Sequence, residues 1–88
     1  MPIPDTASYR IIITSLVCAR KKIGMTQTEL AQIWGKTQSA ITKIENMDRR
    51  LDVQDFLDIC LILSINPSDI IKDAHNELKR QAVKKSNL

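Results

Sequence analysis

Aromatic residues, glycine and proline are all scarce in this chain. Its 88 residues include one Trp, one Tyr and one Phe, together 3% of the sequence, along with two Gly and three Pro. So few aromatic rings argue against a protein that stacks the bases of single-stranded nucleic acid on its side chains. So few helix-breaking residues favour helices, and the sequence has no strand-like alternation, internal repeat or low-complexity segment. We therefore predict an all-α protein.

Residues that carry chemistry are few as well. Cys18 and Cys60 each lie in an apolar helical stretch without metal-type spacing, so both are expected to be buried free thiols. His75, the one histidine, is expected on an exposed helix face. The sequence contains no glycine-rich phosphate loop, nucleophile arrangement or metal-ligand cluster. We therefore expect neither an enzyme nor a protein with a cofactor or a metal ion.

Long apolar runs are missing, and the charge is modest. The longest run, residues 59–63, is far too short to span a membrane, and the N-terminus has no signal-peptide pattern. We therefore expect a cytoplasmic protein without a membrane partner. The net charge of +3 and the isoelectric point of about 9.1 are compatible with a nucleic-acid partner. The length allows one compact domain, which we place at residues 1–78, followed by a basic, flexible tail at residues 79–88.

Apolar periodicity predicts five helices. Their expected ranges are residues 6–22, 27–34, 38–45 and 53–63, and the fifth helix begins at Pro67. Residues suited to cap a helix N-terminus precede three of them, namely Thr26, Thr37 and Asp52. The inward face of the first helix is expected to hold residues at spacings of four, three and four, namely Ile12, Leu16, Ala19 and Ile23.

The second and third predicted helices are joined only by Gly35, Lys36 and Thr37. A connection this short forces the two helices to pack at a steep angle. Ala31 is small enough for the third helix to approach closely, and the space between them is filled by Leu30, Ile41 and Ile44. A small residue, a glycine four positions later and an apolar residue ten positions later form a fairly specific helix-turn-helix spacing.

The outward face of the third predicted helix is polar. The N-terminal half of such a helix enters the DNA major groove, and here it carries Gln38, Ser39, Thr42 and Lys43. Glutamine can bond N6 and N7 of adenine, lysine suits guanine, and serine or threonine can bond several base edges or touch a thymine methyl. Gln27, first in its own helix, is placed to contact a backbone phosphate. The segment therefore predicts binding to double-stranded DNA.

The sequence TQTELAQIWGKTQSAITKIEN, residues 26–46, resembles the helix-turn-helix of the Cro/phage-repressor (Xre-type) family. The sequence RRLDVQDFLDICLILSINPSDII, which follows it, resembles the fourth and fifth helices of that family. The resemblance spans about residues 16–72. It implies a compact five-helix repressor-like domain that contains a helix-turn-helix and binds operator DNA, usually as a two-fold dimer.

The resemblance also implies roles for individual residues. Gln38 and Ser39 would recognise bases, and Gln27 would contact phosphate and brace Gln38. Thr42 and Lys43 would contact bases or phosphates. The remaining expected DNA contacts come from the start of the third helix and from the loop that follows it, namely Thr37, Asn46, Arg49 and Arg50.

A pair of residues and one further position also bear on the resemblance. Arg20 and Glu45 match a pair that joins the first helix to the third in the family, so a structural ion pair is expected between them. The family usually has glycine after the position of Asn46, where this chain has Met47. Either the loop avoids the left-handed conformation or Asn46 adopts it.

A second apolar stripe on the fourth predicted helix indicates a subunit interface. Leu57 and Leu61 lie four residues apart on this stripe. The residues expected to face the core instead are Phe56, Ile59 or Cys60, and Leu63. Ile65 and Ile70, near the turn into the fifth helix, would extend the interface. The alternative is that tail residues cover the stripe.

Together these observations predict a transcriptional repressor that binds a palindromic operator as a homodimer and blocks polymerase. One alternative is the antitoxin of a toxin–antitoxin pair, which uses this kind of domain to autoregulate its operon and also binds a toxin through its tail. The other is a protein-interaction module without DNA binding, against which the polar face of residues 38–43 argues. A steep salt dependence of DNA binding would favour the DNA-binding hypotheses over this last one.

Overall fold

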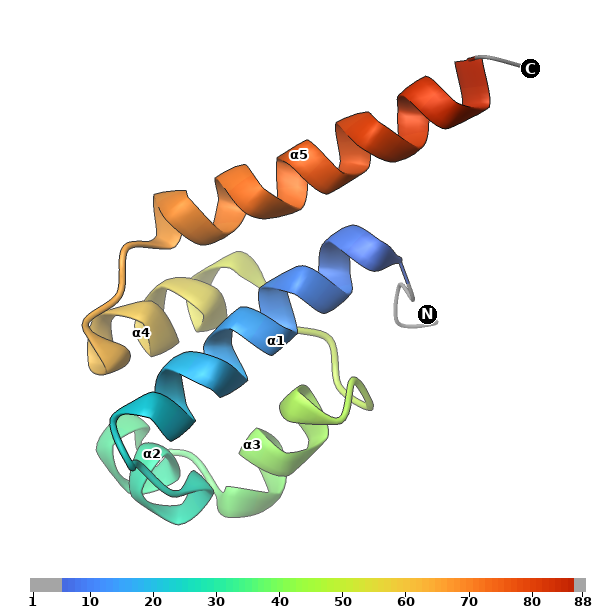
Figure 1. Ribbon diagram of the computed structural model, residues 1–88. Helices are drawn as coiled ribbons and strands as arrows, with labels where there is room; N and C mark the ends of the chain where they lie inside the picture. Colours follow the sequence, from blue (N-terminus) through green and yellow to red (C-terminus); the bar gives the residue numbers. More distant parts are fainter. Residues whose placement is uncertain (1–5, 87–88) are drawn as a thin grey trace.

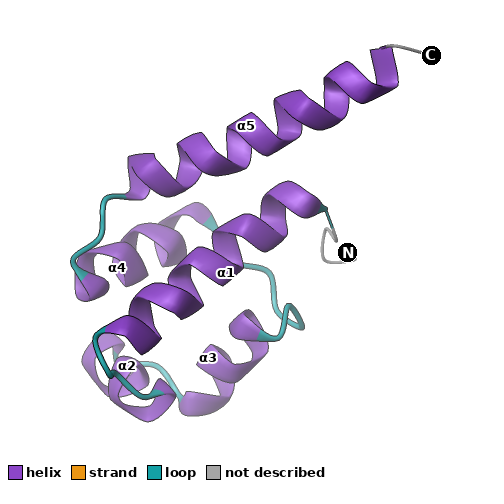
Figure 2. Ribbon diagram, in the orientation of Figure 1, coloured by secondary structure: helices purple, strands orange, loops and turns teal. Residues whose placement is uncertain are grey.

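The computed structural model describes residues 6–86, and five α-helices make up most of this range (Figures 1 and 2). The helices are α1 (Ala7–Lys22), α2 (Gln27–Trp34), α3 (Gln38–Glu45), α4 (Val53–Leu63) and α5 (Pro67–Ser86). No strand occurs within residues 6–86. The all-α, five-helix fold predicted from the sequence is therefore confirmed, as are the bounds of α2, α3 and α4, while α1 begins one residue later than predicted because Thr6 is its N-cap.

Side-chain caps set where the helices begin. The hydroxyl or carboxylate oxygen of each N-cap accepts a hydrogen bond from the backbone N–H three residues on, at Thr6, Thr26, Thr37 and Asp52. At α2 the backbone N–H of Thr26 also donates to the carboxylate of Glu29, which completes a capping box. Hydrogen bonding of the Glu29 carboxylate with the backbone N–H and then the side chain of Thr26 lowers the pKa of Glu29. Each cap satisfies an N–H group that would otherwise lack a helical partner.

Left-handed residues close the first four helices. They are Gly24, Gly35, Met47 and Ser64, with φ of 74°, 77°, 62° and 57°. In each case two backbone hydrogen bonds fold the chain back on the last helical turn, the arrangement known as a Schellman motif. Neither alternative offered for the loop after α3 is correct, because Asn46 keeps a φ of −86° and Met47 itself takes the left-handed position.

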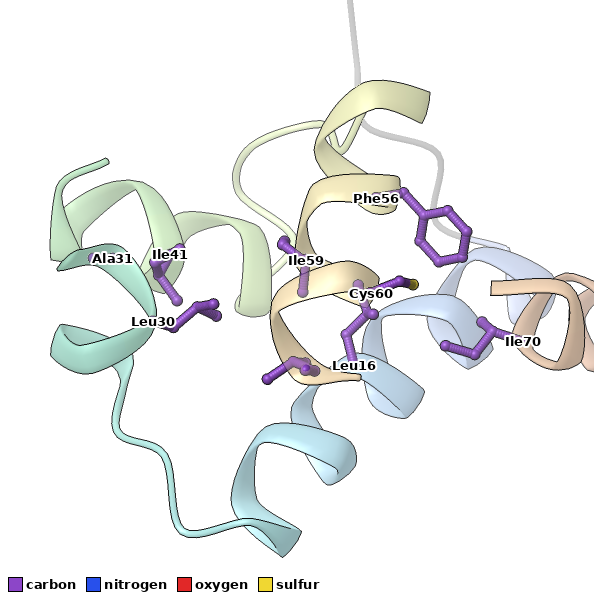
Figure 3. Close-up of a cluster of buried hydrophobic side chains, with 9 residues drawn as sticks. Leu16, Leu30, Ala31, Ile41, Phe56, Ile59, Cys60 and Ile70 are labelled. Atoms are coloured by element: carbon purple, nitrogen blue, oxygen red, sulfur yellow. The ribbon is translucent and has the colours of Figure 1, made fainter. Parts of the chain in front are cut away.

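The core lies where α2, α3 and α4 meet α1 and α5 (Figure 3). Leu30 and Ile41 are 2% and 1% exposed, and Ala31 allows the close approach of α2 and α3 that its small size predicts. On α4 the expected inward residues are buried, namely Phe56, Ile59, Cys60 and Leu63. In Figure 1, α5 runs antiparallel to α1 and packs along it. This core fixes α2 and α3 as a unit on one side of the domain.

Three residues lie elsewhere than the sequence pattern predicts. Cys18 is exposed, because the buried residues of α1 are Ile13, Leu16 and Arg20 and Cys18 falls on the opposite side of that helix. Ile23 is 54% exposed, because it lies just past the last residue of α1. Ile70 is 7% exposed and belongs to the core, so it is not part of a subunit surface. Cys60 is buried as predicted, and this burial raises the pKa of its thiol.

Helix α5 continues to Ser86, across most of the segment that we expect from the sequence to be a flexible tail. No glycine or proline follows Pro67 to break it. The carboxylate of Glu77 accepts hydrogen bonds from Arg80 at 2.6 and 2.9 Å and from Gln81 at 3.0 Å, and such pairs stabilise a helix. Residues 87–88 lie outside the described range, and the domain boundary at residue 78 stays a prediction.

Candidate nucleic-acid interface

Helix α3 has one buried side and one exposed side. Ala40, Ile41 and Ile44 are buried against the rest of the domain. The other side presents Gln38, Ser39 and Lys43, which are exposed, and Thr42, which is half-buried; we call these four residues the α3 face. The hydroxyl of Thr37 is used as the N-cap of α3, where it accepts from the N–H of Ala40 at 3.1 Å. The polar side chains at the N-terminal half of α3 are therefore available to a partner.

An ion pair joins α1 to α3 beneath this face. The Nε of Arg20 lies 2.7 Å from Oε2 of Glu45, and Nη2 of Arg20 lies 2.8 Å from Oε1. Both side chains are largely buried, with 8% and 12% of their surface exposed. The third nitrogen of the guanidinium donates to the carbonyl oxygen of Met25 at 2.8 Å. The pair expected between Arg20 and Glu45 is present, and it also holds the loop that leads into α2.

Gln27 joins α2 to the same ion pair. Its amide nitrogen donates to Oε1 of Glu45 at 2.9 Å, and its amide oxygen accepts from the hydroxyl of Thr42 at 2.8 Å. The resemblance implies that Gln27 braces Gln38, but in the structure its side-chain hydrogen bonds go to Glu45 and Thr42. Gln27 is half-buried and stands at the first position of α2. The phosphate contact expected for Gln27 at the start of this helix stays a prediction.

The loop after α3 is folded tightly onto the end of that helix. The backbone N–H groups of Asp48 and Arg49 both donate to the carbonyl oxygen of Lys43, at 2.8 and 3.1 Å. At the far end of the loop, the N–H of Leu51 donates to the hydroxyl of Tyr9 on α1 at 3.0 Å. The side chains of Asn46, Arg49 and Arg50 are exposed on this loop. It therefore presents polar groups beside the α3 face on a backbone anchored at both ends.

A contact that sequence reasoning missed ties the helix-turn-helix to α4. The indole nitrogen of Trp34 donates to one carboxylate oxygen of Asp58 at 3.0 Å, and the amide of Gln54 donates to the other at 2.8 Å. The hydrogen bonds from Gln54 and Trp34 lower the pKa of Asp58. The ammonium of Lys36, in the turn between α2 and α3, lies 5.4 Å from the ring centre of Trp34. The i,i+4 spacing of Gln54 and Asp58 was the only signal for this cluster in the sequence.

Between residues 6 and 86 no group of three or more His, Cys, Asp or Glu side chains is placed to hold a metal ion. None of the described helices is both long and apolar enough to cross a membrane.

Comparison with known proteins agrees with this geometry. A helix-turn-helix family matches residues 19–70, which is more than half of the chain, so the protein belongs to the helix-turn-helix family. Its Xre type is supported by the structure of an XRE-family like protein from Pseudomonas syringae pv. tomato str. DC3000, with 37% sequence identity and a TM-score of 0.74. That match covers 80% of this chain and 85% of the other. This family consists of DNA-binding transcriptional regulators rather than enzymes.

A second structure supports the fold alone. The clp gene regulator ClgR from Corynebacterium glutamicum is 18% identical, with a TM-score of 0.71, and the match covers 94% of this chain and 88% of that one. No curated protein sequence matches this chain significantly.

Proposed function

We propose that this DNA-binding regulator is a repressor that binds a palindromic operator as a homodimer in the cytoplasm. Each protomer would place α3 in the major groove, with Gln38 and Ser39 against base edges and Lys43 against a base or a phosphate. Gln27, Thr37, Asn46, Arg49 and Arg50 would contact the backbone on either side. Occupying a promoter in this way would exclude polymerase.

The observation that carries the proposal is the contrast between the two sides of α3. Its apolar side is fixed by the core, and Ile41 and Ile44 are 1% and 2% exposed. Its polar side is exposed at Gln38, Ser39 and Lys43, and the neighbouring Thr42 is linked through Gln27 to Glu45 of the buried ion pair. Side chains on a rigid, well-supported helix can hold the geometry that bidentate base contacts require.

The proposed dimer surface lies on α4. Val53, Leu57 and Leu61 follow one another at intervals of four residues, and they are 75%, 44% and 81% exposed; we call them the α4 stripe. Beside the stripe is an apolar groove of about 500 Å³ between α4 and α5, which Phe56, Leu57 and Ile71 help to line. An apolar surface of this kind on a small domain favours association with a second protein chain. Ile65 is half-buried against the core and would contribute only at the edge.

Selection of bound sequences from random duplex DNA tests the DNA-binding part. We expect a palindrome whose half-sites are centred about 34 Å apart, one turn of the double helix. Failure to enrich any sequence would contradict sequence-specific binding, and an unsymmetrical site would contradict the two-fold dimer. A reporter gene placed behind the selected site should lose expression when the protein is present. A rise in expression would show an activator instead.

Sedimentation tests the dimer surface. Leu57→Glu places a charge in the α4 stripe and should convert dimers into monomers, while Ile33→Glu serves as a matched control. Ile33 is 60% exposed on α2, outside the stripe. A dimer that survives the change at Leu57, or one that dissociates equally with the change at Ile33, would locate the interface elsewhere.

The apolar groove also supports a second candidate, an antitoxin that binds a toxin. The groove is lined by residues of α4 and α5, whereas the proposed DNA contacts lie on α2, α3 and the loop after α3. A protein held in the groove would therefore leave the α3 face free. This candidate predicts that the groove binds a protein encoded beside this chain.

A further inference from the structure

A chain of hydrogen bonds converges on Glu45 from Arg20 on one side and from Thr42 and Gln27 on the other, and each bond has one possible donor. The carboxylate of Glu45 can only accept hydrogen bonds, and Arg20 already donates two to it. The group of Gln27 that lies 2.9 Å from Glu45 must therefore be its NH₂ group, which turns the amide oxygen of Gln27 toward Thr42. That oxygen can only accept, so the hydroxyl of Thr42 must be the donor in their 2.8 Å bond. The ion pair thus fixes the direction of each bond up to Thr42.

This direction limits what Thr42 can offer to a base. A hydroxyl has one proton, and both acceptors near it belong to the protein: the amide oxygen of Gln27 at 2.8 Å and the backbone carbonyl oxygen of Gln38 at 3.1 Å. The hydroxyl is therefore not available as a donor to a base edge. Since Oγ1 is held toward α2 and the preceding helical turn, the methyl group on the same Cβ must occupy a different staggered position. Oγ1 keeps a lone pair that can accept a hydrogen bond, but it is turned toward Gln27 and the backbone of Gln38, so the methyl group is the part of Thr42 on the other side of Cβ.

We infer that Thr42 recognises the C5-methyl group of a thymine through its own methyl group, while its hydroxyl positions Gln27. This inference rests on the proposed entry of α3 into the major groove. Thymine is the base that presents a methyl group there among the four unmodified bases. Thr42 lies one helical turn beyond Gln38 on the same side of α3, so its thymine should neighbour the base that Gln38 contacts. Thr42 is thereby a specificity residue rather than a second hydrogen-bonding reader.

The test uses the duplex recovered by selection from random DNA. Each thymine of one half-site is replaced in turn by deoxyuridine, which removes the C5-methyl group and leaves the hydrogen-bonding groups in place. Loss of one buried methyl contact should weaken binding by the wild-type protein about fourfold at one of these thymines. Two variants separate the parts of the side chain: Thr42→Ser keeps the hydroxyl and loses the methyl, and Thr42→Val keeps a methyl and loses the hydroxyl. Thermal melting by circular dichroism checks that both are folded.

The two variants should respond differently to uracil. We expect Thr42→Ser to bind the thymine and uracil duplexes equally and Thr42→Val to keep the fourfold preference for thymine. Equal binding of both duplexes by the wild-type protein, a preference retained by Thr42→Ser, or one lost in Thr42→Val would each overturn the inference while leaving DNA binding intact. A wild-type protein that enriches no duplex at all would overturn the proposed function, and this inference with it.

Discussion

The α3 face and the α4 stripe are both exposed, but different interactions support them from below. Behind the α3 face, a chain of hydrogen-bonded polar groups runs from Arg20 through Glu45 and Gln27 to Thr42. On the α4 stripe's own helix, the opposite side is packed into the core by apolar side chains, among them Ile59 and Cys60. Hydrogen bonds fix the orientation of a side chain, whereas apolar packing fixes its position and is indifferent to direction. A surface that contacts base edges needs the first kind of support, and a surface that a protein partner covers needs only the second.

Removing the ion pair should have the largest effect. Glu45→Ala would leave the guanidinium of Arg20 buried without its carboxylate and should lower the free energy of unfolding by about 3–5 kcal/mol. Urea denaturation measures this change. The exposed pair of Arg80 and Glu77 supplies a matched control, since 58% of the Arg80 side chain is exposed and Arg80→Ala should leave the midpoint almost unchanged. An equal loss of stability in Glu45→Ala and Arg80→Ala would show that the buried ion pair contributes no more than the exposed one.

Substituting a residue that contacts a base should weaken DNA binding without changing the stability of the fold. Gln38→Ala should cost about 1–3 kcal/mol on the selected duplex and little on random DNA, because only the cognate base is hydrogen-bonded. Electrophoretic mobility shifts on the two duplexes measure the difference, and the urea midpoint should not move because Gln38 is exposed. Lys43→Ala is the companion variant. An equal loss on both duplexes, with a smaller salt slope, would assign Lys43 to a phosphate.

Replacing a left-handed residue with glycine should stabilise the protein, both at the end of α4 and at the end of α3. Ser64→Gly, at the end of α4, should raise the free energy of unfolding by up to about 1 kcal/mol, because a side chain disfavours this conformation. Met47→Gly, at the end of α3, should gain less, because Met47 is half-buried and glycine loses its packing. Thermal unfolding measures both. A loss of stability at Ser64 would show that its left-handed backbone carries no strain.

The smallest of the four predicted effects is that of acid. Low pH should weaken the hydrogen bond between Trp34 and Asp58, which links the helix-turn-helix to α4. The pKa of Asp58 is lower in the folded protein than its ordinary value of 3.8, because Gln54 and Trp34 donate hydrogen bonds to its carboxylate. The stability from this contact is therefore complete above pH 3.8 and is lost as the pH falls through the lowered pKa. Since the sequence holds one tryptophan, the fluorescence of Trp34 should report the change between about pH 6 and pH 2.

Asp58→Asn is the control for this titration. The stability advantage of the wild-type protein over Asp58→Asn should shrink as the pH falls. A constant difference between the two proteins across this range would rule out titration of Asp58 as the cause.

The sequence predicted the helices well because their ends depend on local chemistry. Thr26, Thr37 and Asp52 each cap a helix through a bond to a residue three positions away, and such spacings are visible in a linear sequence. The buried residues of α2 and α3 were predictable for the same reason, since helical periodicity places Leu30, Ile41 and Ile44 inward. The exposure of Gln38 and Ser39 follows from that placement.

The contacts that could not be predicted from the sequence depend on how separate helices pack against one another. The bond between Trp34 and Asp58 joins residues 24 positions apart, and the bond between Tyr9 and the loop at Leu51 spans 42 positions. Neither separation follows a helical period. The partners of Gln27 are likewise set by the crossing of α2 over α3, and periodicity alone did not distinguish Glu45 and Thr42 from Gln38. Ile70 was misplaced because its burial depends on the direction in which α5 leaves the turn at residues 64–66.

The lengths of the connections have a consequence for the order in which the helices pack. Residues 35–37 join α2 to α3, which pack closely, so these two helices can meet as soon as each has formed. The extensive contact between α1 and α5 instead joins the two ends of the described chain, and loop-closure entropy opposes a pairing of that kind. We therefore expect α2 and α3 to pack early in folding and the closing of α5 onto α1 to complete the domain last.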